Sequence, residues 1–251
     1  MCTLSWLIEA DRYRVFFNRD ELRTRRPAVP PAVRRRGRVR FVAPLDGDFG
    51  GSWIAVSESG LTLCLLNGFP ATAPPPSPAR YTSRGQLPLS LIDLPSASRV
   101  REQLETTELG CYRPFLLAVF EPEDRLLARW SGRALSFDPQ GLARPPLISS
   151  SFYTEEVRES RSAVFREIGR GADTSDAVER HLAFHRSHRP ERGPFSPCMH
   201  RPDAETVSFT EVEVDPGRVQ MTYTPRSPCR GEPSEPPLAL ERRELPRDRA
   251  S

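Results

Sequence analysis

Residues 1–22, MCTLSWLIEADRYRVFFNRDEL, carry the pattern that decides the fold. Residues 3–10 and 12–17 are rich in apolar and aromatic residues, which is typical of strands, and Asp11 lies between them as a turn. The two stretches therefore predict an antiparallel hairpin. Its second strand ends in Asn18-Arg19-Asp20-Glu21, and antiparallel pairing brings that end back beside Cys2.

The chemistry of Cys2 is distinctive because the initiator Met1 is expected to be removed before so small a residue. Removal leaves a thiol and a free α-amine on one residue, and such an amine has a pKa of about 7.7–8.0. It then acts as a local base and raises the thiolate fraction. We expect Cys2 to be a nucleophile, with Arg19 tuning the thiol and Asp20 holding the amine. The alternative is that the tetrapeptide after the strand is an ordinary charged turn.

The remaining chain alternates predicted strands and helices, without an internal repeat. This order favours an α+β fold in which helices are layered on antiparallel sheets. We expect one domain over residues 1–224, followed by a disordered tail over 225–251 that is rich in Pro, Glu and Arg. Strands are predicted at 53–56, 61–66, 115–120, 125–130, 134–137, 147–150, 207–214 and 219–223, helices at 88–94, 96–105, 154–171 and 173–188, and Pro-rich loops at 24–38 and 70–78.

Composition excludes several function classes. All 36 basic residues are arginine, but 33 acidic residues leave a net charge of only +3. The dense run between Arg34 and Arg40 is either a nucleic-acid patch or a solvated loop, and the near-neutral balance favours the loop and no nucleic-acid partner. No apolar run is long enough to span a bilayer, and no signal peptide is recognisable. A cytoplasmic protein is the expectation.

Metal binding is not predicted. The five cysteines include no CxxC pair, so neither a zinc site nor a disulfide framework is indicated. His181, His185 and His188 have helical spacing and share one face. One interpretation is that this face binds a metal or haem, with Cys198 and His200 extending the site. Solvated helix histidines are the favoured explanation.

The motifs together resemble the NRDE family, also called the transport-and-Golgi-organisation-two family. The resemblance covers roughly residues 1–224 in family order. It rests on Met1-Cys2, Asn18-Arg19-Asp20-Glu21, Gly50-Gly51-Ser52-Trp53, Leu66-Asn67, Ser83-Arg84-Gly85, Ile148-Ser149-Ser150, Cys198-Met199-His200-Arg201 and Thr206-Val207-Ser208.

The resemblance implies a four-layer αββα sandwich of the N-terminal-nucleophile hydrolase type. Relatives such as bile-salt hydrolases, penicillin V acylases and isopenicillin N acyltransferases cleave or exchange a linear amide with an N-terminal cysteine. By this resemblance, Cys2, Arg19 and Asp20 form the catalytic group, Asn67 stabilises the oxyanion, and Arg161 corresponds to a deeper arginine. The resemblance further suggests binding residues at Asn18, Glu21, Gly51, Trp53, Ser149 and Ser150, the two serines standing where the relatives have an asparagine.

Two functions remain open at this point. The first is an amidohydrolase or acyltransferase that acts on a small acyl amide or thioester and needs no cofactor. The second is a non-catalytic protein on the same fold that binds haem or an acyl lipid, as the resemblance to family members linked with haem trafficking suggests. Either partner is a small molecule, and the oligomeric state is left open.

Overall fold

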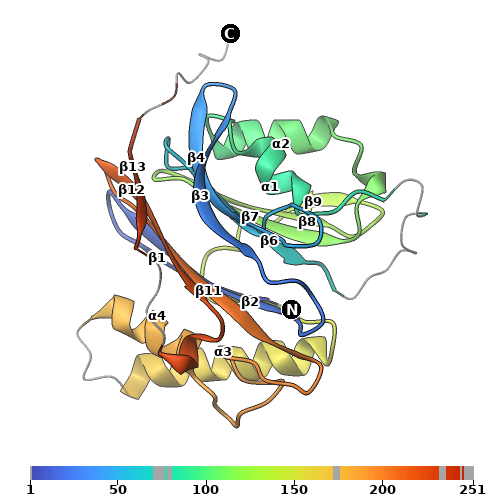
Figure 1. Cartoon of the computed structure of the whole chain (residues 1–251), viewed down its shortest axis with the longest axis vertical. Helices are drawn as coiled ribbons and strands as arrows, with labels where there is room; N and C mark the ends of the chain where they lie inside the picture. The colour runs from blue at the N-terminus through green and yellow to red at the C-terminus, as the bar shows by residue number, and fades with distance from the viewer. Residues whose placement is uncertain are drawn as a thin grey trace.

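A computed structural model describes residues 2–69, 77, 81–171, 176–231, 236–243 and 245. In these residues the strands form two antiparallel sheets that pack face to face, and helices cover both outer faces (Figure 1). The layers therefore follow the order αββα, as expected. No helix in the described ranges is long and apolar enough to cross a membrane.

The first sheet contains the N-terminal hairpin at its centre. Its strands lie in the order β10-β1-β2-β11-β12-β13. Helices α3 (Thr154–Gly171) and α4 (Ala177–Arg186) cover its outer face (Figure 1). The strands are β1 (Cys2–Ile8), β2 (Tyr13–Leu22), β10 (Leu147–Ser149), β11 (Ala204–Val214), β12 (Arg218–Pro225) and β13 (Leu238–Glu241).

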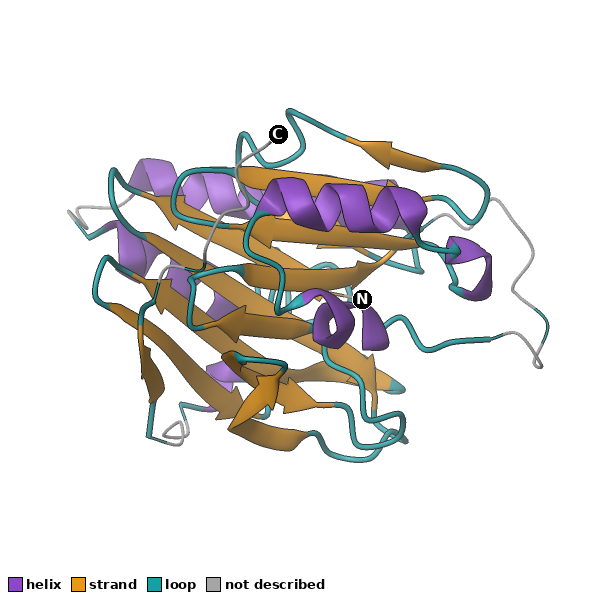
Figure 2. Ribbon diagram, turned by 90° about the horizontal axis from the view of Figure 1, so that it is seen from above, coloured by secondary structure: helices purple, strands orange, loops and turns teal. Residues whose placement is uncertain are grey.

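The second sheet is a meander in which each strand pairs with the next along the chain. Helices α1 (Gln86–Leu91) and α2 (Ala97–Thr106) lie on its outer face (Figure 2). Short 3-10 turns occur at η2 (Leu109–Cys111) and η3 (Pro228–Arg230). The strands are β3 (Val29–Arg36), β4 (Val39–Leu45), β5 (Ile54–Ser57), β6 (Thr62–Asn67), β7 (Phe115–Phe120), β8 (Arg125–Trp130) and β9 (Leu135–Phe137).

The main apolar core lies between the two sheets. Alternate residues of β1, such as Leu4 and Trp6, face this core because successive side chains of a strand point to opposite faces. Phe120 and Cys64 contribute from the second sheet, and Cys64 is the small core residue that its apolar surroundings predict. A separate core lies between the second sheet and α1 and α2. The hairpin is thus fixed by its apolar face.

Many predicted elements are confirmed, including the helix at 96–105, which is α2 (Ala97–Thr106) with Ser96 as its N-cap. The Ser96 hydroxyl accepts a hydrogen bond from the Arg99 amide at 3.3 Å. The predicted loop over 24–38 is wrong over Val29–Arg36, which forms edge strand β3 against β4. The arginines of this segment suggested a solvated loop. An edge strand also tolerates charged side chains, because they discourage pairing with a further strand.

The expected tail also contains ordered structure. Strand β13 pairs with β12, and Leu240 is buried in the core between the sheets. Leu238 and Leu240 alternate as a strand requires, but the surrounding Pro and Arg concealed this short pattern. The structure thus corrects the prediction of disorder for β13 and for η3. Two predictions fall outside the described residues: the loop at 70–78, apart from Ser77, and the helix start at 173–175.

The prediction of solvated histidines on α4 is wrong for His181 and His185. Both are buried, and both contact the Ser5 hydroxyl, through His181 Nδ1 at 2.7 Å and His185 Nε2 at 2.8 Å. Phe16 stacks on His181 with a ring separation of 4.8 Å. These two histidines therefore attach α4 to the hairpin and share no site with His188.

Candidate functional site

A pocket of about 220 Å³ opens beside the start of β1. Both sheets contribute to its wall, because Cys2 and Arg19 belong to the first sheet and Asn67 ends a strand of the second. The pocket therefore lies at one end of the seam between the sheets. Its lining contains the sequence-predicted residues Cys2, Arg19, Asp20, Glu21, Gly51, Trp53 and Asn67.

Cys2 lies between two neighbouring strands. It is paired with Arg19 of β2 on one side and with Ser149 of β10 on the other. Directly opposed residues of an antiparallel pair share a face, so the three side chains lie on the pocket side of the sheet. Burial raises the pKa of the Cys2 thiol, the charge of Asp20 raises it further, and Arg19 opposes them by lowering it. The thiol therefore needs a base in order to react near neutral pH.

Arg19 is held on several sides. Its guanidinium stacks over the Trp53 ring at 4.2 Å, forms a short ion pair with Asp46 and lies 3.6 Å from Glu21. Burial alone would raise the pKa of Asp46, but the Phe49 amide and the charges of Arg19 and Arg25 lower it overall. Asp46 is thus ionised and fixes the arginine, which places a rigid positive charge beside Cys2.

Asp20 and Arg161 lie on the opposite, helix-facing side of the same sheet. Asp20 Oδ2 accepts a hydrogen bond from the Arg161 guanidinium at 3.1 Å, and Oδ1 accepts one from the Thr206 hydroxyl at 2.7 Å. Arg161 also donates to the Thr3 hydroxyl and to the Pro194 carbonyl. Both charged side chains are fully buried. Arg161 thus contacts Asp20 but does not line the pocket. It lies behind β2, where it can position Asp20.

Asn67 and Gly51 shape the wall opposite Cys2. Asn67 is the last residue of β6, where it pairs with Phe115 and leaves its side chain at the pocket. Gly51 lies against Gly85, and a Cβ at Gly51 would come within 2.6 Å of the Gly85 carbonyl carbon. The neighbouring Ser52 amide donates to the Gly85 carbonyl at 2.8 Å. Glycine at position 51 therefore permits a close backbone contact with Gly85.

Comparison with known families and structures now bears on this geometry. The family model described as Transport and Golgi organisation 2 matches residues 1–140, which is more than half of the chain. The chain belongs to this family. The crystal structure of the C2A mutant of conjugated bile acid hydrolase from Clostridium perfringens is similar at a TM-score of 0.56 and 11% identity, over 96% of this chain and 92% of that one. This likeness shows that the Transport and Golgi organisation 2 chain has the fold of the N-terminal-nucleophile hydrolases. The comparison with curated proteins finds no match.

Three residues proposed from motifs in this Transport and Golgi organisation 2 protein lie outside the pocket lining. Asn18 points to the helices and donates to the carbonyls of His185 and Pro197, both at 2.9 Å. The Ser150 hydroxyl accepts from the Phe152 amide at 3.1 Å and belongs to the turn before α3. Ser149 is buried opposite Cys2, and its hydroxyl has no hydrogen-bond partner among the described residues. Of the three, Ser149 is the one placed near the thiol.

Several pocket residues were missed by sequence reasoning. Arg84 lines the pocket, donates to the Pro114 carbonyl at 2.8 Å, and has its pKa lowered by burial. It belongs to the Ser83-Arg84-Gly85 motif of the Transport and Golgi organisation 2 family, so a signal was present. Ser83 and Gly85 share this motif, and Ser52 belongs to the Gly50-Gly51-Ser52-Trp53 motif. The other missed residues carry no chemical pattern by themselves and are brought together by the fold: Arg25, Asp46, Phe49, Leu65 and Tyr81.

Proposed function

We propose that this Transport and Golgi organisation 2 protein is an N-terminal-cysteine amidohydrolase or acyltransferase for a small acyl amide or thioester. The observation that carries the proposal is the position of the Cys2 thiol in a pocket that also contains Arg19 and Asn67. The fold, which it shares with a bile acid hydrolase, supports the same reaction class.

The proposed reaction uses Cys2 as both nucleophile and base once Met1 is removed. The α-amine takes the thiol proton, and the sulfur forms a bond to the acyl carbon while the carbonyl electrons move to oxygen. The amide of Asn67 donates to this oxyanion. Collapse of the intermediate expels the amine or thiolate, which takes the proton from the α-ammonium. Water or a second acceptor then attacks the acyl-enzyme, releases the acyl product and restores the thiol.

The electrostatics of the pocket support these roles for the Cys2 thiol, the α-amine and Arg19. Because burial raises the pKa of the Cys2 thiol, the resting sulfur is protonated and a neighbouring base is required. Arg19 stabilises the thiolate as it forms. The pocket volume of about 220 Å³ lies below the roughly 300–1,000 Å³ of pockets for drug-sized ligands, which favours a short acyl group.

The test is intact-mass and peptide analysis after brief exposure to iodoacetamide or to a short acyl thioester. We expect a mature chain that begins at Cys2 and carries one modification on that residue. Cys2→Ala should lose the modification, whereas Cys111→Ser, which removes a half-buried thiol elsewhere, should keep it. Retention of Met1, or equal labelling of wild type and Cys2→Ala, would contradict the proposal.

A second candidate function rests on a different cavity. A space of about 400 Å³ lies beside β1 and is lined by apolar groups such as Trp6, Ile8 and Phe165, with Arg125 and Arg180 among them. Apolar walls with arginines suit a hydrophobic carboxylate, including haem or a fatty acyl chain, and this supports non-catalytic binding. Titration with haem, followed by Soret absorbance, tests it. We expect a saturable spectral change in the wild type that is lost in Phe165→Asp. A change that does not saturate would contradict haem binding in this cavity.

A further inference from the structure

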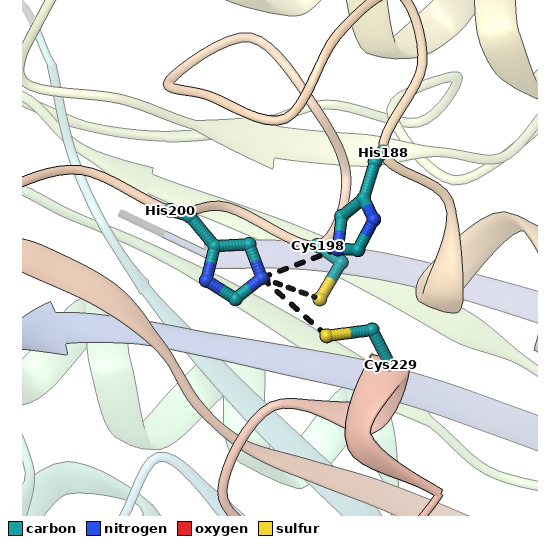
Figure 3. A group of neighbouring side chains, drawn as sticks. All are labelled: His188, Cys198, His200 and Cys229. Atoms are coloured by element: carbon teal, nitrogen blue, oxygen red, sulfur yellow. Dashed lines mark hydrogen bonds between the residues drawn. The ribbon is translucent and has the colours of Figure 1, made fainter.

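A cluster of metal-ligating side chains lies outside the pocket. His188 follows α4, Cys198 and His200 precede β11, and Cys229 is in η3. Figure 3 shows the four side chains turned toward one another. Their ligand atoms, one nitrogen or sulfur each, all lie within 4.8 Å of one another. Segments spread over more than forty residues of sequence therefore converge on one point.

The contacts within the cluster are poorly explained as hydrogen bonds. His200 Nε2 lies 3.2 Å from His188 Nε2, 3.5 Å from Cys198 Sγ and 3.4 Å from Cys229 Sγ. An imidazole nitrogen offers either one lone pair or one N–H group, so it satisfies one such partner in its ring plane. Three partners around the same nitrogen are instead the arrangement of ligands about a shared ion.

The three separations from His200 Nε2 agree with a single tetrahedral ion. With zinc–nitrogen and zinc–sulfur bonds of about 2.0–2.1 and 2.3 Å, tetrahedral geometry separates two nitrogens by about 3.3 Å and a nitrogen from a sulfur by about 3.6 Å. The measured separations of 3.2, 3.4 and 3.5 Å are close to these values. A two-iron cluster is excluded, because its histidines and cysteines bind different irons and face apart.

We propose that His188, Cys198, His200 and Cys229 bind one zinc ion. Two nitrogen and two sulfur ligands are the set that selects zinc among common divalent ions. On binding, both thiols release their protons to solvent, and two thiolates balance the charge of the ion. A neutral site of this kind suits its surroundings, since Cys198 is fully buried and the side chain of His200 is 9% exposed.

The second nitrogen of His200 supports the proposal independently. His200 Nδ1 and the Arg230 guanidinium each lie 3.8 Å from Glu205 Oε2, and that buried oxygen has no hydrogen-bond partner among the described residues. Zinc on Nε2 leaves the proton on Nδ1, where it points to the carboxylate. A carboxylate behind a metal-bound histidine is a common device for orienting the ring. Arg23 fixes Glu205 in turn through an ion pair of 2.8 Å.

Four protein ligands leave no open position, so the proposed zinc is structural rather than catalytic. It joins the loop after α4, the segment before β11 and η3. The amide of Met199, between two ligands, donates to the Thr206 hydroxyl at 2.8 Å, and that hydroxyl donates to Asp20 at 2.7 Å. The ion would therefore stabilise the support of Asp20 without contacting the pocket. The inference does not depend on the proposed reaction.

The test measures zinc in the full chain, purified untagged under reducing conditions without chelator. Inductively coupled plasma mass spectrometry should find about one zinc per chain. Cys229→Ser and His188→Ala should lose most of it. Cys111→Ser is the matched control, because its thiol is likewise half-buried but lies outside the cluster, and it should keep the ion.

A second measurement guards against variants that fail to fold. Wild-type protein stripped by chelation should take up cobalt and show the visible bands and thiolate charge-transfer absorption of a tetrahedral site. Zinc should then displace cobalt and raise the melting temperature. Zinc-free wild type that takes up neither ion would overturn the proposal, as would a Cys198–Cys229 disulfide in protein kept reduced.

Discussion

Two neighbouring residues of β2 serve opposite sides of the sheet. Arg19 points into the pocket, where it stacks on Trp53, and Asp20 points to the helices, where it meets Arg161. This division follows from the alternation of side chains along a strand. The pocket therefore depends on Arg161, which does not line it, because the buried ion pair with Arg161 holds Asp20 in place from behind.

Arg161→Met should destabilise the protein strongly. The substitution removes the cation from a fully buried pair and leaves the Asp20 carboxylate uncompensated, which costs about 3–5 kcal/mol. Urea unfolding followed by circular dichroism measures the change. Arg158→Gln on the same helix removes an exposed ion pair with Glu155 and should change stability by less than about 1 kcal/mol. Equal stability of the two variants would show that the buried pair is not needed.

Elements meet closely at two places that matter for the site. Where the chain enters β5, the backbone of Gly51 contacts that of Gly85 at the start of α1. On the other sheet, α4 contacts β1 through two histidines that share the Ser5 hydroxyl. The first contact shapes the pocket wall, and the second fixes the helical layer behind it. Both are sensitive to small chemical changes.

Gly51→Ala should destabilise the protein and disturb the pocket. Its Cβ would lie 2.6 Å from a backbone carbon of Gly85, so one of the two segments must move, at a cost of about 1–3 kcal/mol. The melting temperature and the alkylation rate of Cys2 report the two effects. Gly110→Ala, whose Cβ meets nothing within 4 Å, should leave both unchanged. If Gly51→Ala has the melting temperature and the Cys2 alkylation rate of the wild type, the pocket wall can adjust to the added methyl group.

Acid should weaken the attachment of α4. Burial lowers the pKa of His181 from 6.5 to about 4 and that of His185 in the same direction. Between pH 6.5 and about 4, His181 is protonated in the unfolded chain but not in the folded chain. The free energy of unfolding therefore decreases as the pH is lowered through this range. At roughly 1.4 kcal/mol per pKa unit, His181 accounts for about 3 kcal/mol.

Urea unfolding at about pH 7 and about pH 4.5 measures this loss of stability. His181→Gln removes the titrating ring and should flatten the dependence. Glu179→Gln, an exposed change on the same helix, should keep the wild-type slope. If His181→Gln and wild type lose stability equally, another group is responsible.

At the scale of the whole molecule, the pocket depends on the packing of one sheet on the other. Cys2 and Arg19 lie on the first sheet, whereas Asn67 ends β6 of the second and Trp53 directly precedes its strand β5. The pocket exists because the apolar core holds these edges together. The last described strand, β13, takes part in that core through Leu240. Strand β13 is therefore part of the domain.

Leu240→Ala should lower stability by about 2–4 kcal/mol, because it removes buried methyl groups from the core between the sheets. Thermal unfolding measures the loss. Glu241→Ala on the same strand is exposed and should be nearly neutral. Below the unfolding transition, Cys2 alkylation should match wild type in both variants. A Leu240→Ala melting temperature equal to that of Glu241→Ala would mean that β13 adds nothing to the core.

The sequence by itself determined many of the elements and the first part of the site. The hairpin at 1–22 and the meander strands β5 to β9 follow from periodicity, which acts over a few residues, whereas β3, β4 and β13 were not predicted. The antiparallel return of the hairpin also places Arg19 beside Cys2, because the pairing is local. The order of the predicted elements indicated helices layered on antiparallel sheets, and the αββα order followed from the family resemblance.

Only the tertiary structure decided which distant residues meet. Asp46 reaches Arg19, and Arg161 reaches Asp20, across segments whose patterns say nothing of each other. The cluster from His188 to Cys229 and the pairing of β13 likewise appear only after the sheets have closed. Local pattern sets which face of an element is apolar. The register and stacking of whole sheets set which polar groups come together, and that information is spread over the entire chain.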